Sequence, residues 1–292
     1  MILLTGATGT VGTPLLRRLT SSGEPVRCLV RDPKRLGAER VRVQIALGDL
    51  SDPPSFRNAM RGVKTVVHLA ASIRDQPGGS IEELNGIATW RMVQAAERTG
   101  VEHFVFFSAL AASTHNRTRF LRAKALAEEA VATSEVRHTI FAPSIVYAPG
   151  DPYLTLLERL ALLPVVPISG RGRALYQPIW AEDVADCVMS VLEDRGERRS
   201  RFELAGPDTL SYEAIVELAL RSFGKRRPLV HVPTPIVSRV LRALEALARS
   251  RAFATWDEAE LMEVSLTSRS GTADAEALGV APQRMPAVLG AA

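Results

Sequence analysis

Two observations predict an α/β fold with a doubly wound parallel sheet and a smaller C-terminal lobe. Through the first half of the 292 residues, short apolar segments alternate with segments of helical periodicity. This alternation is typical of a parallel sheet covered by helices on both faces. In the second half, stretches rich in proline and glycine interrupt the pattern. We therefore expect a sheet domain over residues 1–143, to which 176–204 returns, and a lobe formed mostly by 144–292.

The elements follow from the apolar pattern in chain order. The strands expected in the first half are apolar runs, over 1–6, 25–31, 43–49, 64–70, 103–108 and 137–143. The helices expected between them show helical spacing, over about 10–22, 53–61, 81–99 and 119–134. The second half contains four further helical segments, over about 152–162, 181–194, 211–224 and 235–250. Because ligands of open parallel sheets bind at the carboxyl ends of the strands, the second lobe is expected to cover that edge.

Composition limits the classes of protein to consider. A hydrophobic content of 46% with 23% charged residues is typical of a folded globular chain. The chain opens directly on the apparent strand MILLTG, so we expect no leader peptide and a cytoplasmic protein. Cys28 and Cys187 lie in apolar runs and are expected to be buried free thiols, and the histidines show no metal-ligand spacing. The net charge of +4 and the short cluster GKRRP do not indicate nucleic-acid binding.

A glycine-rich turn, TGATGTVG at residues 5–12, connects the first strand to the first helix. In that context, glycines allow a tight turn and let the backbone approach a pyrophosphate at the helix N-terminus. The turn therefore predicts dinucleotide binding. The residues expected to line this site are the glycines and their neighbours, Gly6, Thr8, Gly9, Thr10, Val11 and Gly12.

The end of the second strand carries conflicting indications about which dinucleotide binds. Arg31 stands there, and a guanidinium suits the 2′-phosphate of NADP(H). Asp32 follows directly, and a carboxylate near this place suits the ribose hydroxyl of NAD(H). We favour NADP(H) and keep NAD(H) as the alternative.

With these motifs and the later segments GDLSD, HLAA, FAPSIVYAPGD and YQPIWAEDVA, the chain resembles an atypical or extended short-chain dehydrogenase/reductase. It is most similar to bacterial relatives of the NAD(P)H-binding accessory subunit of respiratory complex I, and also to NmrA-like and epimerase/dehydratase branches. The resemblance implies a Rossmann domain. It also implies a series of site residues along the strand ends and helices, namely Asp49, Leu50, Leu69, Ala70, Ala71, Asn85, Lys124, Pro143, Ser144 and Ile145.

The sequence departs from this family at the catalytic pair. The family pattern Tyr-x-x-x-Lys is here Phe120-x-x-x-Lys124. The phenol that would donate a proton is therefore missing, a contribution typically worth about 10²–10⁴ in rate. Ser108 remains a candidate hydroxyl, and Tyr147 is a candidate replacement donor from the second lobe.

Three functions remain open from the sequence. The first is an NADP(H)-dependent reductase of a small carbonyl, enone or quinone, in which Lys124 handles the proton. The second is a non-catalytic NAD(P)H-binding accessory, sensor or structural protein, which Phe120 favours. The third is a sugar-nucleotide epimerase or dehydratase, which requires the missing tyrosine. A basic amphipathic helix over 235–251 is expected to pack on its own lobe, with a membrane surface or a protein partner as the alternative.

Overall fold

The computed structural model describes residues 1–194, 201–237, 239, 241 and 255–290. Its centre is a sheet of seven strands in the order β11-β6-β5-β4-β1-β2-β3, and every neighbouring pair is parallel. The strands of this sheet are β1 (Ile2–Thr5), β2 (Val26–Val30), β3 (Gln44–Leu47), β4 (Thr65–His68), β5 (His103–Phe107), β6 (Arg137–Pro143) and β11 (Arg201–Leu204). Strands are added outward on both sides of β1 and β4. The predicted doubly wound α/β fold is therefore confirmed.

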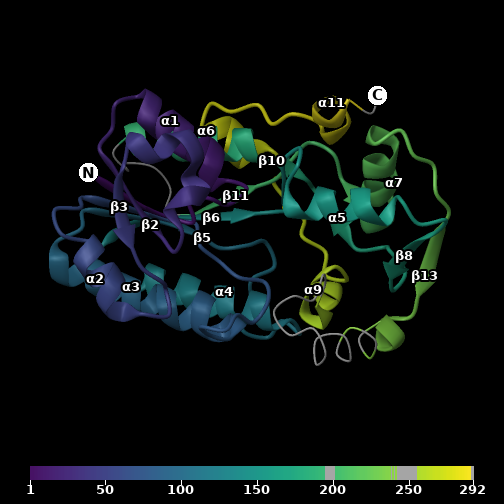
Figure 1. The fold of residues 1–292 in the computed structure, drawn as a ribbon, viewed down its shortest axis with the longest axis horizontal. Helices are drawn as coiled ribbons and strands as arrows, with labels where there is room; N and C mark the ends of the chain where they lie inside the picture. Colours follow the sequence, from purple (N-terminus) through teal and green to yellow (C-terminus); the bar gives the residue numbers. More distant parts are fainter. Residues whose placement is uncertain (195–200, 238, 240, 242–254, 291–292) are drawn as a thin grey trace.

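Helices cover both faces of the sheet, as Figure 1 shows. One face carries α1 (Gly12–Ser21), α6 (Ala181–Glu193) and the 3₁₀ segment η1 (Pro33–Val41). The other face carries α2 (Pro53–Ala59), α3 (Ala88–Thr99) and α4 (Arg119–Ala132). The helix expected over 81–99 begins with a π-helical turn, η2 (Glu83–Ile87), which continues directly into α3. Such turns are rare and are often found at functional sites.

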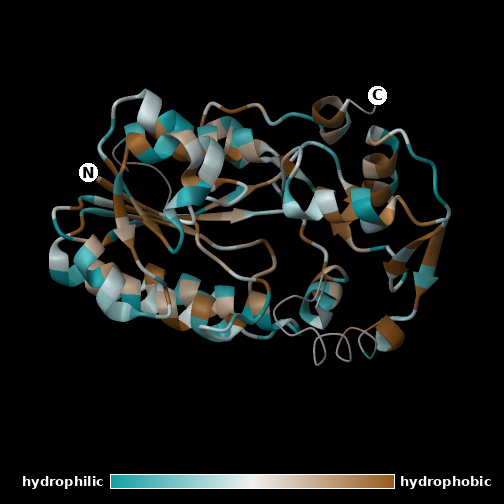
Figure 2. Cartoon of the chain, viewed as in Figure 1, coloured by the Kyte–Doolittle hydropathy of each residue, from teal (hydrophilic) through white to brown (hydrophobic). Residues whose placement is uncertain are grey.

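Apolar residues between these layers form two cores. Leu15, Val188 and the strand residue Leu4 belong to the core under α1 and α6, while Phe56 and Phe104 belong to the core on the other face. Figure 2 shows the corresponding hydrophobic colour along the central strands and the mixed colour of the covering helices. Burying one such side chain stabilises the folded protein by roughly 1.5–3 kcal/mol, so these two cores hold the helices against both faces of the sheet.

Both cysteines are free and buried, as predicted. Burial in the apolar core raises the pKa of the Cys28 and Cys187 thiols to about 12. At neutral pH the thiolate, which is the reactive form, is therefore strongly disfavoured at both positions.

The C-terminal lobe consists of short elements at the carboxyl end of β6 (Figure 1). Its strands form three two-stranded sheets and are β7 (Val146–Tyr147), β8 (Val166–Ser169), β9 (Leu175–Tyr176), β10 (Ile179–Trp180), β12 (Leu210–Ser211) and β13 (Leu229–Val232). Its helices are α5 (Pro152–Leu160), α7 (Tyr212–Ser222), α9 (Trp256–Leu261) and α11 (Met285–Leu289), while α10 (Ala273–Ala277) packs on β11. Tyr147, Tyr176 and Ile215 are fully buried in the core of this lobe.

The segments from residue 176 onward connect the two parts of the molecule. Within 176–204, α6 packs on α1 and β11 pairs with β6 at the edge of the main sheet. Arg18 of α1 forms ion pairs with Glu182 and Asp186 of α6, at 2.5 and 2.6 Å. Most of the amphipathic helix expected over 235–251 lies outside the described residues, so its packing stays a prediction. None of the described helices combines the length and apolar character needed to cross a membrane.

Candidate functional site

The glycine-rich turn has the geometry of a phosphate-binding turn. Gly6 adopts a φ of +72°, and a Cβ there would lie 2.7 Å from the backbone nitrogen of Ala70. A Cβ at Gly12 would lie only 2.0 Å from the carbonyl oxygen of Gly6. The turn is closed by a hydrogen bond of 2.9 Å from the Gly9 N–H to the same oxygen. Both positions therefore require glycine for steric reasons.

The N-terminus of α1 is open to a ligand. Val11 is the N-cap residue, it makes no side-chain capping bond, and the first turn contains no acidic residue. The first N–H groups of a helix lack partners within the helix and carry partial positive charge, so an anion binds there favourably. Gly9 is exposed, and Thr8, Thr10 and Val11 are partly exposed around this helix end. The predicted turn residues thus surround one anion-binding position.

The loop after β4 forms the opposite wall. Leu69 and Ala70 are partly exposed and Ala71 is exposed, and the Ala70 N–H donates to Thr5 Oγ1 at 3.3 Å. Beneath them, the buried His68 ring is hydrogen-bonded to Thr5 Oγ1 at 2.7 Å and to Thr89 Oγ1 at 3.1 Å. Burial, with a smaller contribution from the charge of Lys124, lowers the pKa of His68 to about 3. His68 is therefore a neutral residue that ties β4 to β1 and α3.

Asn85 in the π-helical turn fixes the far end of that loop. Its side-chain nitrogen donates to the carbonyl oxygens of Ser72 and Ile81, both at 2.7 Å, and its side-chain oxygen accepts from the Ser72 N–H at 3.1 Å. Gly86, the next residue, lies against α4, because a Cβ there would be 3.5 Å from the carbonyl oxygen of Ala123. The π turn therefore brings the loop and the residue before Lys124 together.

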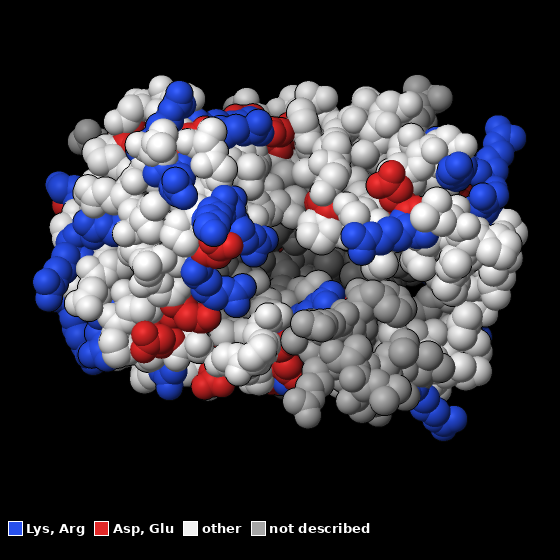
Figure 3. All heavy atoms as spheres, viewed as in Figure 1, with Lys and Arg blue, Asp and Glu red and all other residues white. Residues whose placement is uncertain are grey.

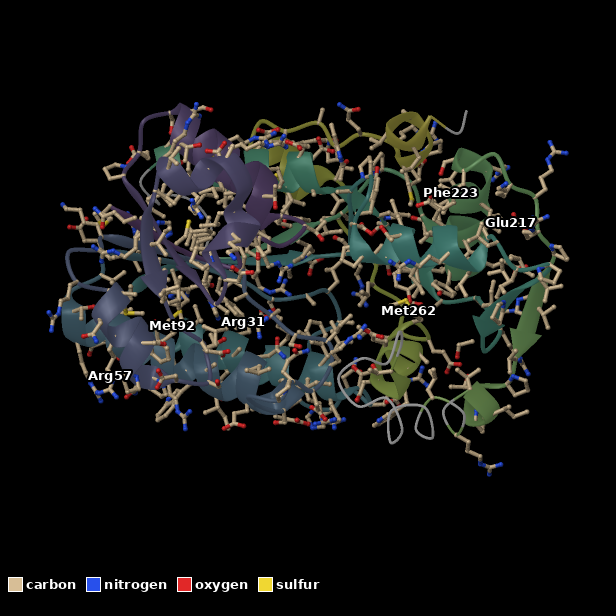
Figure 4. All side chains as sticks on the ribbon, in the orientation of Figure 1. Arg31, Arg57, Met92, Glu217, Phe223 and Met262 are labelled. Carbon is tan, nitrogen blue, oxygen red and sulfur yellow. The ribbon has the colours of Figure 1, made fainter. Side chains whose placement is uncertain are left out.

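The carboxyl ends of β2 and β3 carry the residues expected near the adenosine part of a nucleotide. Arg31 Nη1 lies 3.9 Å from Asp49 Oδ2, and the arginine side chain is 62% exposed. Figure 4 labels Arg31 within the sheet domain, and the residue directly follows β2. Asp49 also accepts hydrogen bonds from the backbone and hydroxyl of Ser51, while Leu50 packs partly on the core below. The Asp32 side chain instead accepts from the Lys34 N–H and begins η1.

Lys124 is buried at the inner face of α4. Its side chain has 3% exposure, and Nζ donates to the Phe107 carbonyl oxygen at 2.5 Å. Nζ lies 4.9 Å from the ring centre of Phe106 and 5.7 Å from that of Phe120. Burial lowers the pKa of Lys124 to about 7, although the nearby charge of Glu128 acts in the opposite direction. Lys124 is therefore a lysine that can gain or lose its proton near neutral pH.

The hydroxyl of Ser108 is hydrogen-bonded to Glu128, which lies one turn further along α4 than Lys124. Ser108 Oγ donates to Glu128 Oε2 at 2.6 Å, and Arg201 Nε donates to Glu128 Oε1 at 2.6 Å. The predicted catalytic hydroxyl is thus engaged with a carboxylate. Nothing in the sequence alone points to Glu128 or Arg201, because Ser108 is 20 positions from Glu128, and Glu128 is 73 positions from Arg201.

Tyr147 lies in a different electrostatic environment from Lys124. Its hydroxyl is buried and has no hydrogen-bond partner within the described part of the chain. Burial and the charges of Asp183 and Asp208 raise its pKa above the ordinary value. Asp183 belongs to α6, whereas Lys124 belongs to α4 on the other face of the sheet. Within the described residues no hydrogen bond joins Tyr147 to Lys124, and the catalytic role of Tyr147 stays a prediction.

Pro143, Ser144 and Ile145 follow β6, but much of their polar capacity is used internally. The Pro143 carbonyl accepts from the Leu110 N–H, and the Ser144 N–H donates to the Leu204 carbonyl. Ser144 Oγ donates to the Leu266 carbonyl at 2.6 Å and accepts from the Gln177 N–H at 3.0 Å. Ile145 packs partly on the core of the C-terminal lobe. These residues join the two lobes, and their expected contact with a nicotinamide ring stays a prediction.

A group of ion pairs borders the site at the N-terminus of α4. Arg119 contacts Asp75, Glu82 and Asp257 at 3.0, 2.7 and 3.3 Å, and it lowers the pKa of Glu82 to about 2. Asp257 belongs to α9, so this group joins the C-terminal lobe to the loop before η2. Figure 3 shows a hollow between the sheet domain and the lobe, with Lys and Arg side chains on both sides of it.

Comparison with known proteins agrees with this geometry. A family model described as NAD(P)H-binding matches residues 6–195, which is more than half of the chain and includes the glycine turn, Arg31 and Lys124. The chain belongs to this NAD(P)H-binding family. The resemblance to atypical and extended short-chain dehydrogenases/reductases is thereby confirmed, and so is NAD(P)H as the class of cofactor. The individual residues predicted to bind it stay a prediction.

Two relatives of this NAD(P)H-binding protein illustrate the range of the family. It is 29% identical over 247 residues to the mitochondrial NADH dehydrogenase (ubiquinone) 1 alpha subcomplex subunit 9 of Arabidopsis thaliana, which covers 79% of this chain. The chain spans only 60% of the length of that relative. It is also 27% identical over 245 residues to a ceramide reductase of Caulobacter vibrioides, covering 80% of this chain and 74% of that protein.

Among solved structures, the fold is similar to that of a dTDP-glucose 4,6-dehydratase from Streptomyces venezuelae. The TM-score is 0.74 with 19% sequence identity, and the superposition covers 100% of this chain and 94% of the dehydratase. At this level of identity the likeness shows the fold alone. The second lobe of the NAD(P)H-binding protein is therefore part of a fold that known enzymes also have.

Proposed function

We propose that this protein is an NADPH-dependent reductase of a carbonyl, enone or quinone-type substrate, in which Lys124 carries the proton. The observation that supports this most is the state of Lys124, which is buried between two phenylalanine rings and has a pKa of about 7. A general acid works best when its pKa is near the operating pH. The similarity to a ceramide reductase agrees with a reductase.

The site fits a nicotinamide dinucleotide. Gly6 and Gly12 leave the space that a Cβ would fill, and the uncapped start of α1 provides N–H donors for a pyrophosphate. We infer a preference for the 2′-phosphate form from Arg31, because its guanidinium is exposed at the end of β2 and its contact with Asp49 is long. Asp32 competes less for a ribose hydroxyl, because it caps η1.

When bound, the reduced nicotinamide would supply a hydride to the electrophilic carbon of the substrate. The substrate oxygen would then gain negative charge, and the Lys124 ammonium can donate a proton to it. An ammonium has three N–H donors, of which one is used by the Phe107 carbonyl. The rings of Phe106 and Phe120 exclude water from Nζ, which keeps the ammonium acidic.

A second candidate is a non-catalytic NAD(P)H-binding accessory protein. Phe120 in place of a tyrosine favours it, and so does Ser108, whose hydroxyl is engaged with Glu128. The similarity to a subunit of the mitochondrial NADH dehydrogenase also favours an accessory protein. A sugar-nucleotide epimerase or dehydratase is less well supported, because that chemistry requires the missing phenol and the dehydratase likeness concerns the fold alone.

Isotope transfer separates the two candidates. NADPH carrying deuterium at C4 of the nicotinamide is incubated with the protein and a panel of quinones, enones and aldehydes. We expect deuterium in at least one product with the wild type, and none with Lys124→Met. Lys64→Met is the matched control, because Lys64 is an exposed lysine paired with Glu102 at 3.1 Å. Tight NADPH binding without transfer to any compound would favour the accessory protein instead.

A further inference from the structure

The C-terminal lobe contains a cavity of about 600 Å³ that none of the predicted site residues lines. Its wall is formed by the loop 170–174 after β8, the end of β13, the end of α9 and Arg117 just before α4. Figure 4 labels Met262, which lines this cavity, on the side of the C-terminal elements, and Arg31 on the side of the sheet. The cavity is therefore distinct from the nucleotide-binding turn.

The loop that borders the cavity is held in a specific conformation. In its sequence Gly-Arg-Gly-Arg, Gly170 and Gly172 adopt φ values of +65° and +63°. A Cβ at Gly170 would meet the Glu263 carboxylate, and one at Gly172 would lie 3.1 Å from Cβ of Glu213. The Gly170 N–H donates to the Val232 carbonyl at 2.9 Å, and the Glu213 N–H donates to the Gly172 carbonyl at 3.0 Å. The loop backbone thus fixes the positions from which the side chains of Arg171 and Arg173 extend.

The charges at the cavity wall are mostly positive. Arg171 and Arg173 form no ion pair or side-chain hydrogen bond with any residue of the described ranges. Arg117 is paired with Glu263 at 3.2 Å, and Glu263 also accepts from the Thr234 hydroxyl. Nε2 of His231 lies 3.5 Å from Oε2 of Glu213. Among the described residues, the cavity is therefore lined by three arginines and one carboxylate, that of Glu263.

We propose that this cavity binds the phosphoryl group of an anionic ligand through Arg171 and Arg173, with Arg117 as a third cation. Guanidinium groups bind phosphate oxygens through two parallel N–H donors. Arg171 and Arg173 would break no ion pair within the described part of the chain when they do so. The glycines hold the loop in place before binding, which lowers the ordering cost.

The position of the cavity gives the proposal a consequence for the reductase, and this step rests on the proposed function. Arg117 lies two residues before the start of α4, and Lys124 lies in the second turn of that helix. Phe120 of α4 and Met262 of the cavity wall pack on the same apolar core. A substrate with its reacting carbon at Lys124 would then carry its phosphoryl group at the other end of an apolar middle part.

Binding tests the proposal without any turnover. The full-length protein is saturated with NADPH, so that the anion position at α1 is filled, and is then titrated calorimetrically with phenyl phosphate, phenol and inorganic phosphate. We expect phenyl phosphate to bind and phenol not to bind. The double variant Arg171→Ala/Arg173→Ala should weaken phenyl phosphate binding by about tenfold or more, because it removes charge-assisted bonds. NADPH affinity should stay unchanged.

The matched control is Arg159→Ala/Arg221→Ala, which removes the same charge from exposed positions of α5 and α7 in the same lobe. Equal weakening in both double variants would overturn the proposal, because it would report net charge alone. Glu263→Gln should tighten phenyl phosphate binding a few-fold, since it removes the opposing carboxylate and releases Arg117. The proposal would also be overturned if all these variants bound phenyl phosphate as tightly as the wild type does. It would likewise be overturned if the wild type did not bind phenyl phosphate.

Inorganic phosphate distinguishes the two sources of the anion. Binding of phenyl phosphate that is clearly tighter than that of inorganic phosphate supports an ester with an apolar part. Equal affinities that both depend on Arg171 and Arg173 support an anion site for free phosphate. Neither result depends on hydride transfer, so a failure of the isotope experiment leaves this test intact.

Discussion

Lys124 should make the stability of the protein depend on pH in a defined direction. Its ordinary pKa is 10.5, and burial lowers the value in the folded protein to about 7. Between these two pH values the unfolded chain binds one proton more at this position than the folded protein does. The free energy of unfolding should therefore rise with pH, by about 1.4 kcal/mol for each pH unit. Below pH 7 the folded protein carries a buried ammonium and bears the full penalty.

The substitution Lys124→Met removes this titration while keeping a side chain of similar length. From pH 7 to pH 9, the wild type should gain about 2 kcal/mol of unfolding free energy relative to the variant, because the folded lysine is already half deprotonated at pH 7. The lost bond to the Phe107 carbonyl also changes stability, and so does the altered packing against Phe106. Neither of these effects depends on pH, so both cancel when the slopes are compared.

Urea unfolding followed by far-ultraviolet circular dichroism, at intervals between about pH 6 and pH 9, measures the difference. The control Lys64→Met should keep the wild-type slope, because Lys64 is an exposed lysine with 69% side-chain exposure. If wild type and Lys124→Met give parallel plots of unfolding free energy against pH, the lysine is not titrating near neutrality. The assignment of Lys124 as the proton-bearing group would then lose its basis.

Three further substitutions test the nucleotide site and the lysine pocket. Gly12→Ala should reduce NADPH affinity at least about tenfold and lower the melting temperature, because its Cβ would lie 2.0 Å from a backbone oxygen; calorimetry and thermal unfolding measure this. Arg31→Ala should erase the preference for NADPH over NADH. The control Arg57→Ala, at an exposed position of α2, should keep that preference. A wild type that binds both nucleotides equally would contradict the cofactor assignment. Phe120→Tyr should change the reduction rate by less than about tenfold if Lys124 is the donor, whereas a rise of about 10² or more would show that a phenol is the missing group.

The parts of the fold and site that depend on local sequence could be predicted. The glycine turn is one example, because Gly6 and Gly12 are required by contacts within a few residues and with one neighbouring strand end. The parallel sheet is another, since apolar strands and amphipathic helices alternate along the chain. Arg31 at the end of β2 was also placed correctly, because the strand boundary fixes it.

The parts of the fold and site that depend on long-range contacts could not be predicted from the sequence. The hydrogen bond from Ser108 to Glu128 joins a strand end to a helix face, and nothing in the local sequence distinguishes Glu128 from an exposed glutamate. The cationic cavity combines Arg117 with a loop more than fifty residues later, so only the tertiary fold brings these charges together. The alternation of glycine and arginine at 170–173 is visible in the sequence, within one of the proline- and glycine-rich stretches of the second half.

The return of the C-terminal residues to the sheet domain has a consequence for how the molecule can be divided. Asp274 accepts a hydrogen bond of 2.7 Å from the N–H of Glu203 in β11, and the Gln283 N–H donates to Asp183 of α6 at 2.8 Å. The chain thus passes between the two lobes several times, and each lobe is assembled from separated stretches of sequence. A fragment ending at residue 143 would expose the edge of β6 and the face of α1 that α6 covers. Exchanging the second lobe between relatives therefore requires several splice points chosen together, and a single proteolytic cut would leave the halves attached.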